Sequence, residues 1–114
     1  MRKKSVARPA WLAAAEPAAV SGGPAWTFLT NHAHVLLCIY REPKSRLRDL
    51  ALRVGITERM VQRIVTDLAE AGYVAVEKHG RRNRYQVRRD MRLRHPLESQ
   101  CSVTRLLDSL SPGA

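Results

Sequence analysis

The side chains with the most directed chemistry are an arginine–glutamine group and an arginine cluster that follows it in the chain. Gln62 and Arg63 follow Arg59 by three and four residues, so on a helix the three side chains would share one face. A guanidinium can donate two hydrogen bonds to the edge of guanine, and a glutamine amide can pair with adenine. The run GRRNR at 80–84 offers further guanidinium groups, which suit phosphate oxygens. These residue types indicate recognition of a nucleic acid.

Two short helices joined by a tight corner must position the first group. The run RDLALRVGITERMVQRIVT at 48–66 has apolar residues at helical spacing on both sides of Gly55. Gly55 can take the left-handed conformation that ends a helix, and the Thr57 hydroxyl can cap the next one. Ala51 is small where the two helices would cross. We expect helices over 48–54 and from 58 to about 71, in a helix-turn-helix arrangement.

A hairpin is expected to carry the arginine cluster. The stretches YVAVEKH at 73–79 and RYQVRRD at 84–90 alternate as strands do, and GRRN lies between them as a turn. A lone hairpin is not stable in water. It must therefore pack one side, formed by Val74, Val76 and Val87, against the helices.

The flanking segments complete the predicted order of elements. A first helix is expected from Thr27 to Arg41, with Thr30 or Asn31 as the N-cap of its main part, followed by an extended segment at 45–47. After a basic linker at 91–96, residues 97–110 have the spacing of an amphipathic helix. That helix either packs on the first helix or pairs with its copy in a dimer, and we favour the dimer slightly.

The charge of the chain is concentrated in one region. The net charge is +10 over 114 residues. Residues 73–96 hold eight basic and two acidic side chains, a net +6, whereas residues 97–114 hold one basic and two acidic, a net −1. The excess therefore follows the second helix of the corner directly, where an element that contacts phosphates would be expected.

Several other classes of function find no support. Cys38 and Cys101 do not make a disulfide framework, and His32 and His34 are two apart, so they would point to different sides of a helix. No nucleophile–base pair, glycine-rich phosphate loop or carboxylate pair stands out, so we expect no enzyme, cofactor or metal. No apolar run is long enough to span a bilayer, and the N-terminus does not read as a signal peptide, so the expected location is the cytoplasm.

The run LRDLALRVGITERMVQRIVTDLAEAGYVAVEKHGRRNRY resembles winged helix-turn-helix transcriptional regulators, similar to the MarR and ArsR families of bacterial repressors. The resemblance covers about residues 27–95. It implies that residues 57–66 contact bases and backbone in a major groove, and that the wing at 80–84 reaches the adjacent minor groove or phosphates. The expected DNA-binding residues are, on the recognition helix, Thr57, Arg59, Gln62, Arg63 and Thr66, and, on the wing, Lys78, Arg81, Arg82, Asn83, Arg84 and Arg88.

The expected fold is mainly α with a small β-hairpin: a three-helix core, a two- to three-stranded wing and a C-terminal helix. Residues 1–25 would form a disordered basic arm, 26–95 the DNA-binding domain and 96–114 the terminal amphipathic helix. The expected partner is double-stranded DNA, bound by a homodimer. ArsR-type paired cysteines and long MarR-type flanking helices are missing, which argues against a metal or small-molecule effector.

The alternative is a winged helix that binds a protein or RNA, because a fold does not settle function. A protein-binding winged helix can do without an arginine-rich wing, and RNA binding more often shows exposed aromatic side chains.

Overall fold

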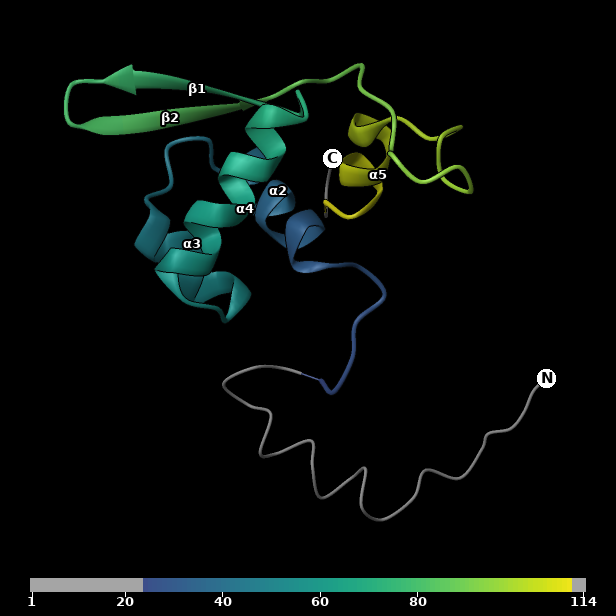
Figure 1. Cartoon of the computed structure of the whole chain (residues 1–114), viewed down its shortest axis with the longest axis horizontal. Coiled ribbons are helices and arrows are strands. Elements are labelled where there is room, and N and C mark those ends of the chain that lie inside the picture. The colour runs from purple at the N-terminus through teal and green to yellow at the C-terminus, as the bar shows by residue number, and fades with distance from the viewer. Residues whose placement is uncertain (1–23, 112–114) are drawn as a thin grey trace, which may run out of the picture.

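The computed structural model describes residues 24–111, so nearly all of the predicted arm at 1–25 lies outside the described residues. Its helices are α2 (Asn31–Arg41), α3 (Leu47–Val54), α4 (Glu58–Glu70) and α5 (Val103–Ser109), and its strands are β1 (Val74–His79) and β2 (Arg82–Val87). Helices α2, α3 and α4 pack together, the hairpin projects at one end, and α5 lies at the other (Figure 1). The predicted class, mainly α with a small hairpin, is confirmed. Within the described range, no helix is both long and apolar enough to cross a membrane.

The corner between α3 and α4 forms as its local signals predict. Gly55 ends α3 with φ 86° and ψ 35°, and its N–H donates to the Ala51 carbonyl over 2.8 Å. A side chain at this φ would be strained, which is why glycine suits the position. The Thr57 hydroxyl accepts from the Met60 N–H over 3.0 Å and so caps α4.

One hydrophobic core holds the three helices and the base of the hairpin. Helix α4 contributes the face predicted from its spacing, Val61, Ile64, Val65 and Leu68. It meets Val35, Leu36 and Ile39 of α2 and Leu50 and Ala51 of α3. Because apolar burial fixes which face of α4 points inward, it also fixes which face remains for solvent or a partner.

The hairpin is tighter than predicted. The strands are joined by a two-residue loop that begins at Gly80, whose φ is 65°. The predicted four-residue turn was wrong, because Asn83 already pairs with Lys78 in the ladder. Glycine at the first loop position permits a primed turn, whose twist matches that of the strands.

Only the base of the hairpin packs on the helices. Val74, Tyr85 and Val87 are buried, as a helix-facing side requires. Val76, predicted to join them, is 44 % exposed although its cross-strand partner Tyr85 is buried, because the turn before α3 packs against β2, where the Tyr85 N–H donates to the Pro43 carbonyl. The arginine-bearing loop is therefore displayed beyond the core.

The expected extended segment at 45–47 is not a strand, and the sheet in the described part of the chain has two strands. The Ser45 N–H donates to the Glu42 carbonyl over 3.1 Å in a turn, and α3 already begins at Leu47. A single backbone bond, from the Tyr85 N–H to the Pro43 carbonyl over 2.9 Å, links this turn to β2.

Helix α2 begins four residues later than the predicted Thr27. Thr30 is its N-cap, with the hydroxyl accepting from the Ala33 N–H over 3.4 Å. Trp26 and Phe28 are 67 % and 92 % exposed, so an earlier helical turn would bury little to stabilise itself.

The segment predicted as a linker at 91–96 is partly structural. Met91 and Leu93 pack against the core, and the Tyr73 hydroxyl donates to the Arg92 carbonyl over 2.6 Å. Residues 97–101, expected to be helical, form turns, because Ser102 caps α5 by accepting from the Arg105 N–H over 3.1 Å.

Helix α5 packs on α2 within the same copy of the chain. Val103 and Leu107 are fully buried. The Tyr40 hydroxyl donates to the Asp108 carboxylate. Packing on the core, which was one of the two predicted uses of this helix, thus accounts for Val103 and Leu107, whereas Leu106 is half-buried and Leu110 is exposed.

Candidate nucleic-acid interface

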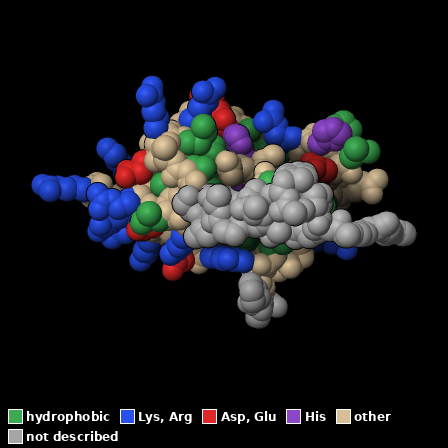
Figure 2. All heavy atoms as spheres, turned by 90° about the horizontal axis from the view of Figure 1, so that it is seen from below, with side chains coloured by type: hydrophobic (Ala, Val, Ile, Leu, Met, Phe, Trp, Pro, Cys, Tyr) green, Lys and Arg blue, Asp and Glu red, His purple; other side chains and the backbone are tan. Residues whose placement is uncertain are grey.

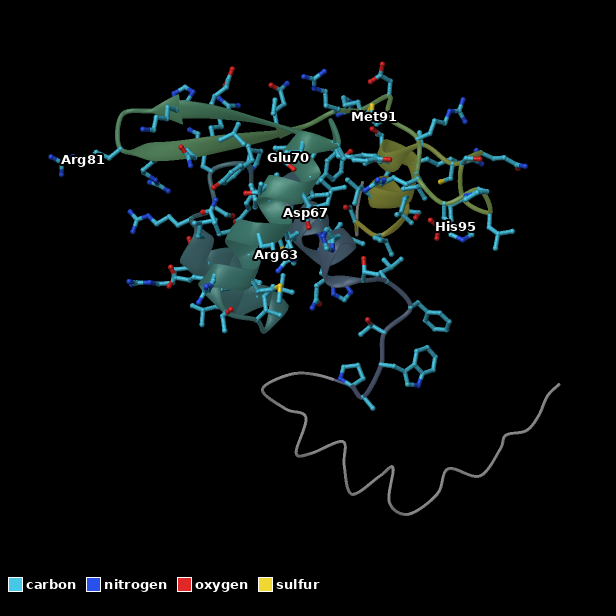
Figure 3. All side chains as sticks on the ribbon, viewed as in Figure 1. Arg63, Asp67, Glu70, Arg81, Met91 and His95 are labelled. Carbon is cyan, nitrogen blue, oxygen red and sulfur yellow. The ribbon has the colours of Figure 1, made fainter. Side chains whose placement is uncertain are left out.

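The exposed face of α4 carries the residues that were predicted to contact base edges. Arg59, Gln62 and Arg63 all lie in solvent, opposite the buried face of the helix. Arg63 projects from the middle of α4 in Figure 3. All three side chains are free to reach a base edge, which requires donors on a helix face that can enter the major groove.

The two threonines predicted for the same surface are already engaged with the backbone. The Thr57 oxygen accepts from the Met60 N–H and keeps its own proton for another acceptor. The Thr66 hydroxyl donates to the Gln62 carbonyl over 2.9 Å, which leaves its methyl group and an acceptor lone pair on the outside. Of the two threonines, only Thr57, at the start of α4, therefore keeps a hydroxyl donor for a partner.

Charge changes sign along the exposed face of α4. Arg59 and Arg63 outnumber Glu58 in its first two turns, whereas Asp67 and Glu70 lie toward its end. Figure 3 shows Arg63, Asp67 and Glu70 following one another along the helix. Asp67 is in contact with His32, whose Nε2 lies 2.9 Å from its Oδ2. A polyanion would be attracted to the first half of α4 and repelled by the second.

The hairpin is a basic surface. Residues 74–88 hold five basic side chains and one acidic side chain, Glu77. All six residues predicted for the wing are exposed, namely Lys78, Arg81, Arg82, Asn83, Arg84 and Arg88. Arg81 lies at the tip in Figure 3, and in Figure 2 Lys and Arg side chains gather at this same end of the molecule. Such a projecting cluster suits phosphate groups.

A cleft of about 410 Å³ joins the hairpin to the start of both helices of the corner. Arg46 and Arg48, at the start of α3, line it together with Arg81, Arg82 and Glu58, the first residue of α4. The sequence predictions did not include these two arginines beside α3. The alternating RLR ahead of the corner was the only signal for them, and nothing in it indicates that they face the wing.

A second hollow lies away from this surface. An open, largely apolar groove of about 460 Å³ is bounded by the start of α2, the end of α4, α5 and the segment before it. The sequence argues against a small-molecule effector because long flanking helices are missing, and it did not predict this groove. The turns at 97–101, where a continuous helix had been expected, line part of the groove through Glu98 and Cys101.

Reactive groups are scarce in the part of the chain that the structure describes. Within residues 24–111 no group of three or more His, Cys, Asp and Glu side chains could hold a metal ion. Burial raises the pKa of the Cys38 thiol, so at neutral pH it is a protonated, poorly nucleophilic group.

Comparison with known families agrees with this geometry. The model of the MarR family matches residues 30–83, from the N-cap of α2 into β2. Comparison with curated proteins gave no match. The MarR resemblance inferred from the sequence is confirmed over that segment, and it supports a DNA-binding regulator of transcription with a winged helix. The resemblance to the ArsR family stays a prediction.

Proposed function

We propose that this MarR-like chain is a sequence-specific regulator of transcription. The first half of α4 would contact the bases of double-stranded DNA, and the hairpin would contact the DNA backbone. The observation that carries the proposal is the shared cleft. Glu58 of α4 and Arg81 and Arg82 of the hairpin line the same hollow, so both elements can meet one duplex. A helix in the major groove would then have the wing beside it on the adjacent backbone or minor groove.

The two groups divide the work between specificity and affinity. Arg59, Gln62 and Arg63 would contact base edges, because their donors are exposed and different sequences present different acceptors. Arg81, Arg82, Arg84 and Arg88 would contact phosphates, which are the same at every sequence. Lys78 and Asn83, paired across the strands, would support the same backbone contact.

The charge gradient of α4 favours one orientation. Asp67 and Glu70 would repel phosphates if the end of the helix entered the groove. The start of α4, with Arg59 and the free hydroxyl proton of Thr57, should therefore lie deepest.

The proposed assembly is a homodimer on an inverted repeat. The described residues leave large apolar side chains exposed where they bound the groove or flank it, including Phe28 at 92 % and Leu97 at 89 %. Pairing two copies would cover such surface and would set two α4 helices about one helical turn of DNA apart. Sedimentation velocity over a range of concentrations is expected to show a dimer, and a monomer both free and on DNA would contradict this part.

A protein- or RNA-binding winged helix fits less well. Tyr85, the aromatic residue at the hairpin, is buried and cannot stack on an unpaired base. A protein-binding surface would not need the concentration of arginine on the hairpin. Acting on DNA, the proposed bacterial-type regulator would work in the cytoplasm.

Replacing Arg63 by alanine tests the reading role. On a duplex that carries the site selected by the protein, R63A should lose about 1–3 kcal/mol of binding free energy and discriminate less at one base pair. Fluorescence anisotropy with single-base variants of the duplex measures both effects. R105A, which removes an exposed arginine of α5, is the matched control and should bind as the parent does. A uniform loss on all sequences would instead identify Arg63 as a phosphate contact.

A further inference from the structure

Ser45, in the turn before α3, has a buried hydroxyl without a partner. The residue is 7 % exposed, and among the described residues its oxygen alone is a buried side-chain polar atom with no hydrogen bond. The turn holds it in place, because the Ser45 N–H donates to the Glu42 carbonyl over 3.1 Å. Buried polar groups are nearly always hydrogen-bonded, so this hydroxyl points to a partner that arrives from outside.

The surroundings of Ser45 are mainly basic. It lines the cleft between α3 and the hairpin, where Arg46, Arg48, Arg81 and Arg82 outnumber one acidic side chain, Glu58. Glu58 lies 3.9 Å from the Arg48 guanidinium, and both are well exposed, so this pair is weak.

A neighbouring hollow also reaches Ser45 and is more balanced. It combines Arg41, Lys44 and Arg84 with Glu42 and Asp49. Glu42 is already paired with Arg53. An anion is therefore expected on the other side, in the cleft beside the hairpin.

The start of α3 adds backbone donors to this cleft. Its N-cap is Arg46, whose side chain has no acceptor for the amides of the first turn. The cap is one-sided: the Asp49 carboxylate accepts from the Arg46 N–H over 3.2 Å. The first-turn N–H groups of Leu47 and Arg48 and the dipole of α3 thus remain available to an anion.

Two hydrogen bonds connect the two sides of the cleft, the hairpin and the turn before α3. The Arg82 guanidinium donates to the Lys44 carbonyl over 3.0 Å, and the Tyr85 N–H donates to the Pro43 carbonyl over 2.9 Å. These bonds hold the hairpin against the turn that carries Ser45. A ligand in the cleft would meet a preorganised set of donors, which lowers the entropy cost of binding.

We propose that this cleft binds one backbone phosphate of the DNA, with the Ser45 hydroxyl and the first-turn amides of α3 donating to its oxygens and Arg46, Arg48 and Arg82 supplying charge. The Ser45 oxygen is buried, so the proposed contact requires the lining of the cleft to rearrange as the phosphate enters. The site rests on the proposed function and adds a third anchor, between the reading helix and the wing. Its role is to set the register of α4 in the groove.

Ser45→Ala separates this role from a structural one. S45A should bind every duplex about ten-fold more weakly, because it removes a hydrogen bond to a charged group. Its salt dependence should match that of the parent, because a neutral hydroxyl releases no counterions, whereas R48Q should lower the slope by about one. The melting temperature should stay or rise, because S45A breaks no side-chain hydrogen bond within the chain. Anisotropy titrations and thermal melts provide these values.

Two controls keep the outcomes distinct. S99A removes a serine hydroxyl that donates to the Pro96 carbonyl in the loop before α5, and it should leave DNA binding unchanged. Neutral methylphosphonate, placed one position at a time in the duplex, should weaken the parent wherever a phosphate is contacted, and at one of these positions the loss should be smaller for S45A than for the parent. This double-mutant comparison holds even if S45A is less stable.

S45A binding as tightly as the parent, or equal methylphosphonate losses for both proteins at every position, would overturn the phosphate site. If R63A still loses specificity in that case, the proposed function stands alone. A parent protein that binds no duplex would overturn both.

Discussion

Replacing Arg81, Arg82 and Arg84 together by glutamine should weaken binding to every duplex by about a hundred-fold or more at about 0.1 M salt. Each arginine that neutralises a phosphate adds about 0.9 to the slope of log K against log salt, so the triple variant should have a slope smaller by about three. All three side chains are exposed and, within residues 24–111, only the Arg82 hydrogen bond to the Lys44 carbonyl is lost, so the free energy of unfolding should fall by about 1 kcal/mol or less. Titrations at four or more salt concentrations measure the slope directly.

The matched control removes the same charge elsewhere. R89Q, R94Q and R105Q together also delete three exposed arginines, but away from the hairpin tip. This control should change the slope little. If it weakens binding as much as the hairpin variant does, total charge and not the wing would account for affinity.

Leu50→Ala should destabilise the fold by about 2–5 kcal/mol, because it leaves a cavity where α3 packs on α4. Leu50 is fully buried, at 0 % exposure. Its neighbour Leu52 on the same helix is 75 % exposed, so L52A removes the same atoms from solvent and should cost less than about 0.5 kcal/mol. Urea denaturation followed by circular dichroism compares the two. Equal effects of the two variants would mean that α3 is not packed through Leu50.

The hairpin variant and L50A also separate stability from recognition. Below its unfolding transition, L50A should retain the base preferences of the parent, because Arg59, Gln62 and Arg63 are unchanged. The hairpin variant should do the reverse, keeping most of its stability while its affinity falls.

The helix-turn-helix could be predicted closely because its signals are local. Gly55 ends α3 through its own φ, and Thr57 caps α4 through a bond three residues away. The buried face of α4 follows from helical spacing alone. Such features depend on neighbours in the sequence, so a single chain is enough to recognise them.

The ends of the domain could not be predicted because tertiary contacts decide them. Leu93 reads as part of a polar linker, yet it packs on the core, and the Tyr73 hydroxyl holds the backbone of Arg92. The late start of α5 depends on Ser102 and on the turns before it. The helical spacing of apolar residues over 97–110 does not indicate these tertiary contacts.

In the candidate site, too, features set by the local sequence could be predicted and features set by tertiary contacts could not. The types and exposure of Arg59, Gln62 and the hairpin arginines followed from sequence, although their contacts with DNA stay a prediction. The approach of Ser45 and Arg48 to the hairpin did not follow, because it depends on how the turn before α3 docks on β2.

The most direct test of sequence-specific reading by α4 is selection of duplexes from a random library at two salt concentrations, followed by sequencing. We predict an enriched inverted repeat with half-sites about one helical turn apart, retained at the higher salt. R63A run in parallel should relax one position of each half-site. Tight binding at low salt without any enriched motif would contradict the account, because α4 would then be a backbone anchor and not a reader of sequence.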